Sequence, residues 1–400
     1  MVHGVGWQTD FRCAAPESDP ANVSAASART SDRRCSRGRR AGTPCQPTPY
    51  GQNQNCWSPL SGLNLAVLLC FIAHDTTTTA VYREEVHVIL CCGEALIDFI
   101  PTVAADGREC FLPAPGGCPY NTAIAAARLG VPTGFQGRVS SDMFGEQIVE
   151  RLAANSVSMQ HLARGDQPTT LAFVKRNQKG EARYAFFANG SADRSFAHRD
   201  AGQQLPREIS CLMFGSISLL LEPGATTIVN LVRRETGKRV LSFDPNVRAN
   251  LIADRPAYLE RFVDLASRST VVKISDADLA WLYPTVPVND AAIGLVDAGA
   301  CLVVVTMGEN GSRAFSKRLD VGVPAVPVEV SDTVGAGDSY HAGLLAWLHD
   351  RKLLTVDAIA GLSAEQATAA MTFAAHVAAV TCSRAGADPA HRHELPQSLQ

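Results

Sequence analysis

Three features are scarce or missing in this sequence, and each absence excludes a class of protein. The 36 basic and 39 acidic residues give a net charge of -3, so no excess of positive charge favours nucleic acid or an anionic membrane as a partner. The 12 cysteines form no C-x-x-C and no Cys/His spacing typical of a metal site, which favours reduced thiols and a cytoplasmic protein. With 46% apolar residues the chain can form a large core, and we expect small-molecule ligands.

A hydrophobic run long enough to cross a membrane is also missing. The apolar stretch Leu63–Ala73 has about half the length that a membrane span needs. It lies too far from Met1, without a clean cleavage site, for an ordinary signal peptide. The sequence therefore predicts no membrane segment.

Residues 1–85 lack any sustained helical or strand periodicity and are rich in polar residues and proline. This composition predicts a disordered N-terminal extension. We interpret the basic run Arg33–Arg40 as solvated rather than as a nucleic-acid or targeting patch. Five cysteines in this segment leave a secreted disulfide module open as an alternative. A further alternative is translated upstream sequence that the functional protein lacks.

The stretch Ser331–Tyr340 is the most informative part of the chain, because its small residues lead directly into the apolar helix pattern of His341–Leu348. Glycines at a helix start leave backbone N–H groups bare, and these groups together with the helix dipole form an anion site. Asp338 beside such a site is suited to accept a proton from a hydroxyl that attacks a phosphoryl group. The alternative is an acid that only stabilises the helix dipole. The spacing does not fit the dinucleotide pattern G-x-G-x-x-G.

The first part of the expected domain contains two stretches that suit a ligand crevice. The buried strand His87–Gly93 runs on through an apolar pattern to Asp98, which we expect at a strand end facing the crevice. Gly116 and Gly117 allow the backbone to approach a ligand, and Asn121 in the following helix offers a donor and an acceptor for hydroxyl groups. The alternative role of Asn121 is helix N-capping.

Two further patterns predict how the chain folds. Leu171–Val174 and Tyr184–Phe187 read as paired strands across the turn Asn177–Gly180, which predicts a small separate sheet. The second half then alternates strands with helices, which is typical of a parallel sheet with both faces covered. The expected strands are Ile209–Phe214, Val240–Phe243, Thr270–Ile274 and Cys301–Thr306.

Four motifs, in this order along the chain, resemble those of the ribokinase-like, PfkB-type carbohydrate kinase family. They are G-E-A-L-I-D ending at Asp98, G-G-C-P-Y-N-T-A around Asn121, D-P-N-V-R ending at Arg248, and D-T-V-G-A-G-D-S around Asp338. This sequence departs from the family at Ser140, where glycine is usual, and at Ser275 and Asp278, which replace the Asn and Glu of N-x-x-E.

The resemblance implies a three-layer α/β/α fold with a central, mostly parallel sheet and a small β-sheet lid. The kinase domain is expected over residues 86–390, with lid strands within about 98–115 and 168–190, followed by a C-terminal tail at 391–400. Residues 1–85 lie outside the resemblance.

The resemblance also implies a role for individual residues. Asp338 is the expected base, and the N–H groups of Gly335, Ala336 and Gly337 stabilise the transferring phosphoryl group. The expected sugar-binding residues are Asp98, Gly116, Gly117, Asn121, Arg194 and Arg248. For Arg194 a surface ion pair is the open alternative. The expected nucleotide-binding residues are Thr306, Gly308, Gly311, Thr333 and His376.

The implied ligands are ATP, a sugar, Mg²⁺ near Asp244 and Asp278, and a monovalent cation such as K⁺ near Asp332. The segment S-A-D-R ending at Arg194 is most similar to bacterial fructokinase-like members, so the expected reaction converts fructose and ATP to fructose 6-phosphate and ADP. The alternatives are a 2-keto-3-deoxygluconate kinase, a ribokinase, or a catalytically silent sugar- or nucleotide-binding regulator. A homodimer is also expected.

Overall fold

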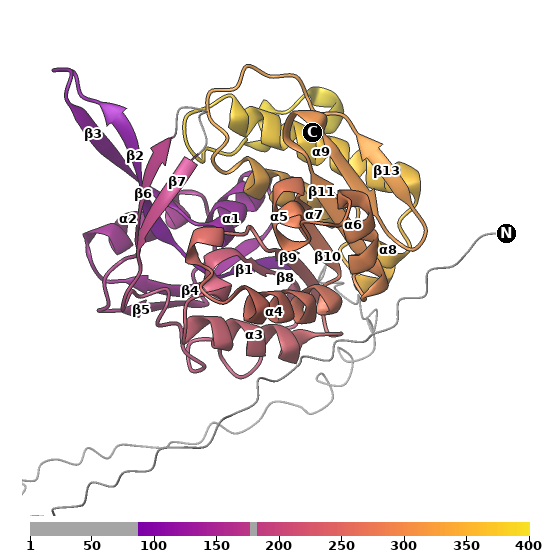
Figure 1. Ribbon diagram of the computed structural model, residues 1–400, viewed down its shortest axis with the longest axis horizontal. Coiled ribbons are helices and arrows are strands. Elements are labelled where there is room, and N and C mark those ends of the chain that lie inside the picture. The colour runs from indigo at the N-terminus through magenta and orange to yellow at the C-terminus, as the bar shows by residue number, and fades with distance from the viewer. Residues whose placement is uncertain (1–86, 177–181) are drawn as a thin grey trace, which may run out of the picture. The chain divides into compact units, whose positions relative to one another are not determined.

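The computed structural model describes residues 87–176 and 182–400 (Figure 1). Two predictions therefore lie outside the described residues. They are the disordered extension over residues 1–85 and the turn at Asn177–Gly180 between the two lid strands.

A nine-stranded sheet forms the centre of the described domain, with the strand order β13-β12-β11-β10-β9-β8-β1-β4-β5. Neighbouring strands are parallel except at one edge, where β12 and β13 are antiparallel. The strands are β1 (Val88–Cys92), β4 (Thr133–Ser140), β5 (Leu162–Gly165), β8 (Ile209–Gly215), β9 (Val240–Asp244), β10 (Val271–Ser275), β11 (Leu302–Thr306), β12 (Ser312–Phe315) and β13 (Asp320–Val323). The four strands expected in the second half are thus present within a residue or so of their predicted bounds.

Both faces of this sheet are buried, because its strands carry nearly continuous apolar runs and alternate residues point to opposite sides. On β11, Leu302 and Val304 belong to one core, and Val303 and Val305 belong to the other. Helices α1, α2, α7, α8 and α9 contribute to the first core, and α3 to α6 contribute to the second. The predicted three-layer α/β/α architecture is confirmed.

The helices are interleaved with the strands along the chain (Figure 1). They are α1 (Cys118–Arg128), α2 (Met143–Ala154), α3 (Gly224–Glu235), α4 (Arg255–Arg268), α5 (Asp276–Leu282), α6 (Val288–Asp297), α7 (Ala336–Asp350), α8 (Val356–Ala360) and α9 (Ala364–Cys382). Short 3₁₀ turns are η1 (Ser216–Leu219), η2 (Ala249–Leu251), η3 (Gly308–Asn310), η4 (Arg392–Glu394) and η5 (Gln397–Leu399).

A second, four-stranded sheet has the order β3-β2-β6-β7 and lies apart from the central sheet (Figure 1). Its strands are β2 (Leu96–Val103), β3 (Glu109–Gly116), β6 (Leu171–Arg176) and β7 (Ala182–Phe187). The pairs β2/β3 and β6/β7 are antiparallel, and β2/β6 is parallel. The predicted small sheet is therefore present.

One expectation about this region is wrong. Asp98 is not at the end of the first buried strand but is the third residue of β2. The central strand ends at Cys92, and Gly93 has a φ of 153°, a conformation that L side chains rarely adopt. The chain turns at Gly93 and continues as β2 in the small sheet. The sequence had predicted a single pattern running from the first strand to Asp98.

Residues 391–400, expected as a C-terminal tail, contact the rest of the domain. Leu395 is buried, and the Arg392 side chain donates to the backbone oxygen of Leu129 and pairs with Asp350. Within the described ranges, none of the helices combines the length and the hydrophobicity needed to cross a bilayer.

Candidate active site

The start of α7 has the open geometry that its glycines predict. Gly335 is the N-cap residue with a left-handed φ of 77°, and no side chain caps the helix there. A Cβ at Gly335 would lie 2.8 Å from the Cβ of Ala387, so a side chain would also be crowded. Apart from the amide of Ala336, which donates to the Thr333 backbone oxygen at 3.3 Å, the first turn offers its backbone N–H groups and the positive end of the helix dipole to a ligand.

Two cavities meet at this turn. The larger, about 510 Å³, is lined by Ala336 and Gly337, and the smaller, about 200 Å³, by Gly335, Gly337 and Asp338. Thr333 and Gly337 line both cavities. A group bound in one cavity can therefore meet a group bound in the other at the start of α7.

Asp338 lies on the smaller cavity and is 7% exposed. Its Oδ2 accepts a hydrogen bond of 2.9 Å from the Asn121 side-chain amide. Burial, and then the nearby Asp244 carboxylate, raise the pKa of Asp338, although the bond from Asn121 opposes this shift. Once it has lost its proton, a carboxylate with a raised pKa is a stronger base than an ordinary one.

Helix α1 places Asn121 because of the way the helix begins. Its N-cap is Gly117 with a φ of 118°, and the amide of Cys118 donates to the Glu94 carboxylate at 3.2 Å. Glu94 also accepts from the amide of Ser218. Asn121 is therefore not the N-cap, and its side chain is directed to Asp338 instead.

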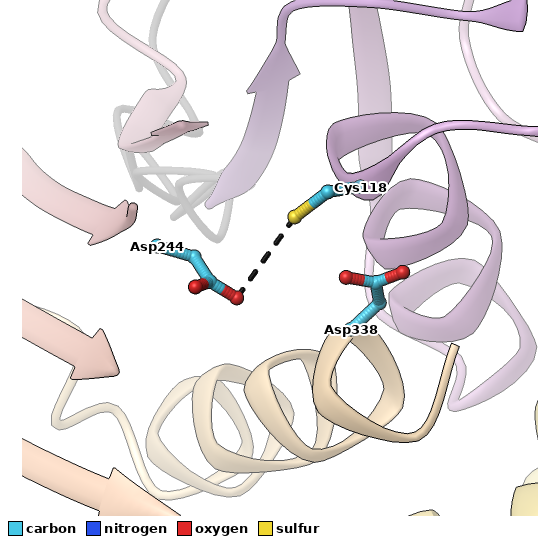
Figure 2. Close-up of side chains that lie close together, drawn as sticks. All are labelled: Cys118, Asp244 and Asp338. Atoms are coloured by element: carbon cyan, nitrogen blue, oxygen red, sulfur yellow. Dashed lines mark hydrogen bonds between the residues drawn. The ribbon is translucent and has the colours of Figure 1, made fainter. Parts of the chain in front are cut away.

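A second carboxylate, Asp244, lies at the end of β9 close to Asp338 (Figure 2). In Figure 2 the side chains of Asp244, Cys118 and Asp338 converge from β9, α1 and α7. Asp244 Oδ2 is 3.9 Å from the Cys118 sulfur and 2.9 Å from the ammonium of Lys273. Burial would lower the pKa of Lys273, but the Asp244 carboxylate outweighs it and leaves that pKa raised. The pair is therefore an ion pair.

The remaining wall of the smaller cavity comes from the small sheet and the loop after β9. Asp98 and Tyr184 contribute from β2 and β7, and Asn246 and Arg248 from the loop. Arg248 Nη1 donates to Asn246 Oδ1 at 2.6 Å, and its guanidinium lies 5.5 Å from the centre of the Tyr184 ring. Burial raises the pKa of Asp98 to about 7, against the opposing charge of Arg248. Gly116 leaves room here, since a Cβ would collide with the Asp98 carboxylate.

Four of the five residues expected to bind the nucleotide line the larger cavity. Thr306, Gly308 and Gly311 line it where β11 ends, and Thr333 lines it from the start of the α7 motif. Helix α9 supplies the small side chains of Ala375, Ala378 and Ala379. His376 lies on the same helix but is not among the described residues that line this cavity.

Arg194 and the expected metal residues lie as follows. Arg194 donates to the backbone oxygen of Glu222 and to Asn189 Oδ1, and it is not among the described residues that line either cavity. Asp278 accepts from the amide of Val247 at 3.2 Å, and Ser275 is the N-cap of its helix. Asp332 accepts from the amides of Thr333 and Gly386, so it links the α7 motif to the loop after α9.

Comparison with known proteins identifies the family. The model of the pfkB family of carbohydrate kinases matches residues 86–393. This chain belongs to that family. It is similar to a fructokinase from Rhizobium leguminosarum bv. trifolii, at 40% identity over 78% of this chain and 92% of that protein.

Two solved structures resemble this kinase. A fructokinase from Xylella fastidiosa with bound ATP has a TM-score of 0.68 at 28% identity, covering 77% of this chain and 95% of that one. A fructokinase variant from Vibrio cholerae O395 in a fructose-, ADP- and potassium-bound form has a TM-score of 0.66 at 26% identity, covering 76% and 94%. The chain is thus a ribokinase-like sugar kinase in fold and family.

Sequence reasoning assigned no role in this kinase to Glu94 or Lys273, although both line the smaller cavity. A signal existed for each. Lys273 interrupts the apolar run of strand β10, V-V-K-I-S, and Glu94 follows directly on a buried strand and its glycine. A charged residue in an otherwise buried strand indicates a specific partner.

Proposed function

We propose that this kinase transfers the γ-phosphoryl group of ATP to a hydroxyl group of fructose, giving fructose 6-phosphate and ADP. One observation carries the proposal: two cavities meet at the open start of α7, and the buried carboxylate of Asp338 lines the smaller one. The similarity to fructokinases adds support for the sugar.

In the proposed mechanism Asp338 takes the proton from the attacking hydroxyl. The hydroxyl oxygen forms a bond to the γ-phosphorus, and the bond from that phosphorus to the bridging oxygen of ADP breaks, so ADP leaves with the electron pair. The backbone N–H groups of Gly335, Ala336 and Gly337 stabilise the charge on the phosphoryl oxygens. Positioning of the two substrates on either side of this turn provides much of the remaining acceleration.

We assign fructose to the smaller cavity. Asp98, Asn121 and Arg248 line it and supply acceptors and donors for hydroxyl groups. Gly117 also lines it, and Gly116 leaves room for the Asp98 carboxylate. Arg194 keeps a proposed role in sugar binding only if its side chain moves, because its present hydrogen bonds hold it at Glu222 and Asn189.

We assign ATP to the larger cavity, with Thr306, Gly308, Gly311 and Thr333 near the nucleotide and the alanines of α9 against the base. His376 is proposed to border the base from the same helix. The phosphates would then extend to the start of α7, where the helix dipole favours negative charge.

The residues near the start of α7 fit a magnesium ion. Asp244 and Asp278 supply carboxylate oxygens, which Mg²⁺ prefers, and Mg²⁺ usually keeps several of its waters. Because the Asp244 carboxylate is already paired with Lys273, we propose that these residues hold the metal through water. Bound Mg²⁺ would neutralise charge on the ATP phosphates.

A monovalent cation is proposed at Asp332. The carboxylate oxygens of Asp332 join the backbone at Thr333 to the backbone at Gly386, so they lie where two loops meet. The bound form of the Vibrio cholerae relative includes potassium. Dialysis against a sodium- and potassium-free buffer, followed by titration with KCl, tests this assignment through kcat.

A homodimer and a cytoplasmic location complete the proposal. The small sheet exposes large apolar side chains, including Phe111, Leu112 and Phe187, which a second copy of this chain would cover. Light scattering measures the mass directly, and a monomer at micromolar concentration would rule the dimer out. The cysteines of the described residues are free thiols, which supports the cytoplasmic location.

The test of the function is an ADP-release assay with fructose, ribose, 2-keto-3-deoxygluconate and adenosine, compared by kcat/KM. We expect fructose to exceed the others by at least about tenfold, which is about 1.4 kcal/mol of preference. A preference for ribose or adenosine would show a different sugar kinase. No turnover with any of them, while ATP still binds, would favour a silent regulator.

A 2-keto-3-deoxygluconate kinase is the second candidate, and one observation favours it. The guanidinium of Arg248 lies on the wall of the smaller cavity, where it could bind a carboxylate. Arg248→Lys distinguishes the two sugars, because a bidentate contact to the carboxylate would be lost while fructose would keep its hydroxyl contacts.

A further inference from the structure

Lys273 occupies an unusual place for a charged side chain. Strand β10 lies in the middle of the central sheet, and its neighbours Val272 and Ile274 face one core while Lys273 faces the other side, toward α7. The lysine side chain is 6% exposed and its ammonium lies 2.9 Å from Asp244 Oδ2. A buried ion pair is weak evidence for a gain in stability, because desolvation opposes the attraction. The pair therefore calls for another explanation.

The ammonium lies against the first turn of α7. A Cβ built on Gly337 would be 2.8 Å from Lys273 Nζ, so the absence of a side chain at Gly337 allows the ammonium to approach the helix backbone. A positive charge at a helix N-terminus is unfavourable on its own, because the dipole presents its positive end there. The arrangement becomes favourable when an anion binds at the same place.

The charged groups packed around the ammonium come from several elements. Asp338 contributes from α7, Asp244 from β9, Asp278 from α5 and Arg248 from the loop after β9. His341 is buried beside Asp244, and its Nε2 lies 2.6 Å from Ser242 Oγ. The Asp244 carboxylate holds the ammonium at one side, while Lys273 also lines the smaller cavity.

We propose that Lys273 is a catalytic residue whose ammonium contacts the phosphoryl group as it passes between the two cavities. The inference rests on the proposed phosphoryl transfer, to which it adds a fixed positive charge beside the backbone N–H groups of Gly335–Asp338. Lys273 stays protonated throughout and moves no proton. Asp338 takes the proton of the sugar hydroxyl, and the electron pair of the broken bond leaves with ADP. Asp244 acts as the positioning residue that holds the ammonium in place.

The test removes the charge in two ways. Lys273→Met keeps most of the apolar stem, and Lys273→Gln keeps a polar donor without the charge. We expect each to lower kcat by roughly 10²–10³-fold, the loss typical of one group that stabilises charge in the transition state. KM for the sugar should stay within about threefold, because the ground state makes less use of this charge. Lys273→Arg should recover part of kcat.

A second readout separates this role from a structural one. The complex of sugar, MgADP and aluminium fluoride mimics the transferring phosphoryl group, so its affinity should fall with kcat in both neutral variants. The affinity for ADP alone should change little. Lys238→Met, at an exposed lysine after α3, is the matched control and should leave all values unchanged.

Three results would overturn the proposal. A folded Lys273→Met or Lys273→Gln enzyme with kcat within threefold of wild type would show that the charge is not used. A loss of kcat without weaker binding of the aluminium fluoride complex would assign Lys273 to positioning alone, and failure of both neutral variants to fold would assign it to the fold. The assay uses whichever sugar the wild-type enzyme prefers, so a wrong sugar assignment leaves this test intact.

Discussion

The central sheet is buried on both faces, whereas the two faces of the small sheet differ, since one lines a cavity and the other carries packed aromatic rings. On the small sheet, Asp98 and Tyr184 line the smaller cavity, and the phenyl rings of Phe99, Phe111 and Phe173 pack together on the other side. The central sheet instead carries Asp244 at the end of β9 and Lys273 in the middle of β10, and both lie next to α7.

This difference suggests a division of roles. The residues of the proposed phosphoryl transfer, Asp338 with Asp244 and Lys273, belong to the densely packed part of the molecule. Part of the proposed sugar site comes from a sheet with exposed side chains, where fewer contacts oppose movement. Substitutions in the two regions should therefore affect different quantities.

The largest effect is expected at Asp338. Asp338→Asn keeps the size of the side chain but removes the base, so kcat should fall by roughly 10²–10⁴-fold. The affinity for ATP should persist or increase slightly, because a negative charge near the phosphates is gone. Single-turnover rates and ATP titrations measure both.

The matched control for Asp338→Asn is Asp290→Asn, at an exposed aspartate in the first turn of α6. If Asp338 acted only on the helix dipole, both variants would lose about 0.3–1 kcal/mol of stability and keep their turnover. A folded Asp338→Asn enzyme within threefold of wild type would remove the base from the mechanism.

Stability should show the same contrast between the sheets. Phe243 on β9 is buried and stacks on Phe214, so Phe243→Ala should lower the free energy of unfolding by about 3–5 kcal/mol. Phe111 on β3 is 48% exposed, and Phe111→Ala should cost less than about 1 kcal/mol. Urea denaturation of both variants compares them. Equal losses would contradict the difference in packing.

Sugar affinity should depend on the small sheet. Asp98→Asn removes a charged acceptor, which we expect to raise KM for fructose by about 10–100-fold, the equivalent of about 1.5–3 kcal/mol. The effect on kcat should be smaller. Asp106→Asn, at an exposed aspartate in the turn between β2 and β3, is the control and should behave like wild type. A KM for Asp98→Asn that matches this control would exclude Asp98 from the sugar site.

The raised pKa of Asp98 also predicts a pH dependence. Burial brings this pKa to about 7, so the carboxyl is mostly protonated below pH 7 and mostly ionised above it. If the ionised form accepts the sugar hydroxyls, affinity for fructose should fall by up to about tenfold per pH unit as the pH drops below 7. Calorimetric titration at pH 6 and pH 8 tests this, and Asp98→Asn should abolish the dependence. A flat wild-type profile would mean that both forms of Asp98 bind the sugar equally well, and weaker binding at pH 8 would mean that the protonated form binds it.

The smallest effect is expected from a deletion in the N-terminal extension, residues 1–85. Deleting Met1–Arg83 should leave the melting temperature and kcat nearly unchanged, because a segment of this composition is expected to bury little apolar area and so to stabilise little. A decrease of many degrees in melting temperature would show that the segment packs against folded structure.

Much of the fold could be predicted from the sequence, because continuous apolar runs and the glycine-rich helix start are local patterns. The exception at Asp98 is instructive. Gly93 separates two strands of different sheets, and apolar periodicity does not distinguish a turn at glycine from a strand that continues. The pattern identified the residue but not the element that carries it.

The sequence by itself determined the start of α7, since Gly335, Gly337 and Asp338 are neighbours in the chain and helix geometry fixes how their backbone N–H groups lie. Only the tertiary structure decided which partners meet there. Asn121 donates to Asp338 across 217 residues of sequence, and Lys273 reaches both Asp244 and Gly337. The parallel strand order brings the ends of distant strands to one edge of the sheet. Side-chain pairing at that edge depends on register and packing, which no local pattern specifies.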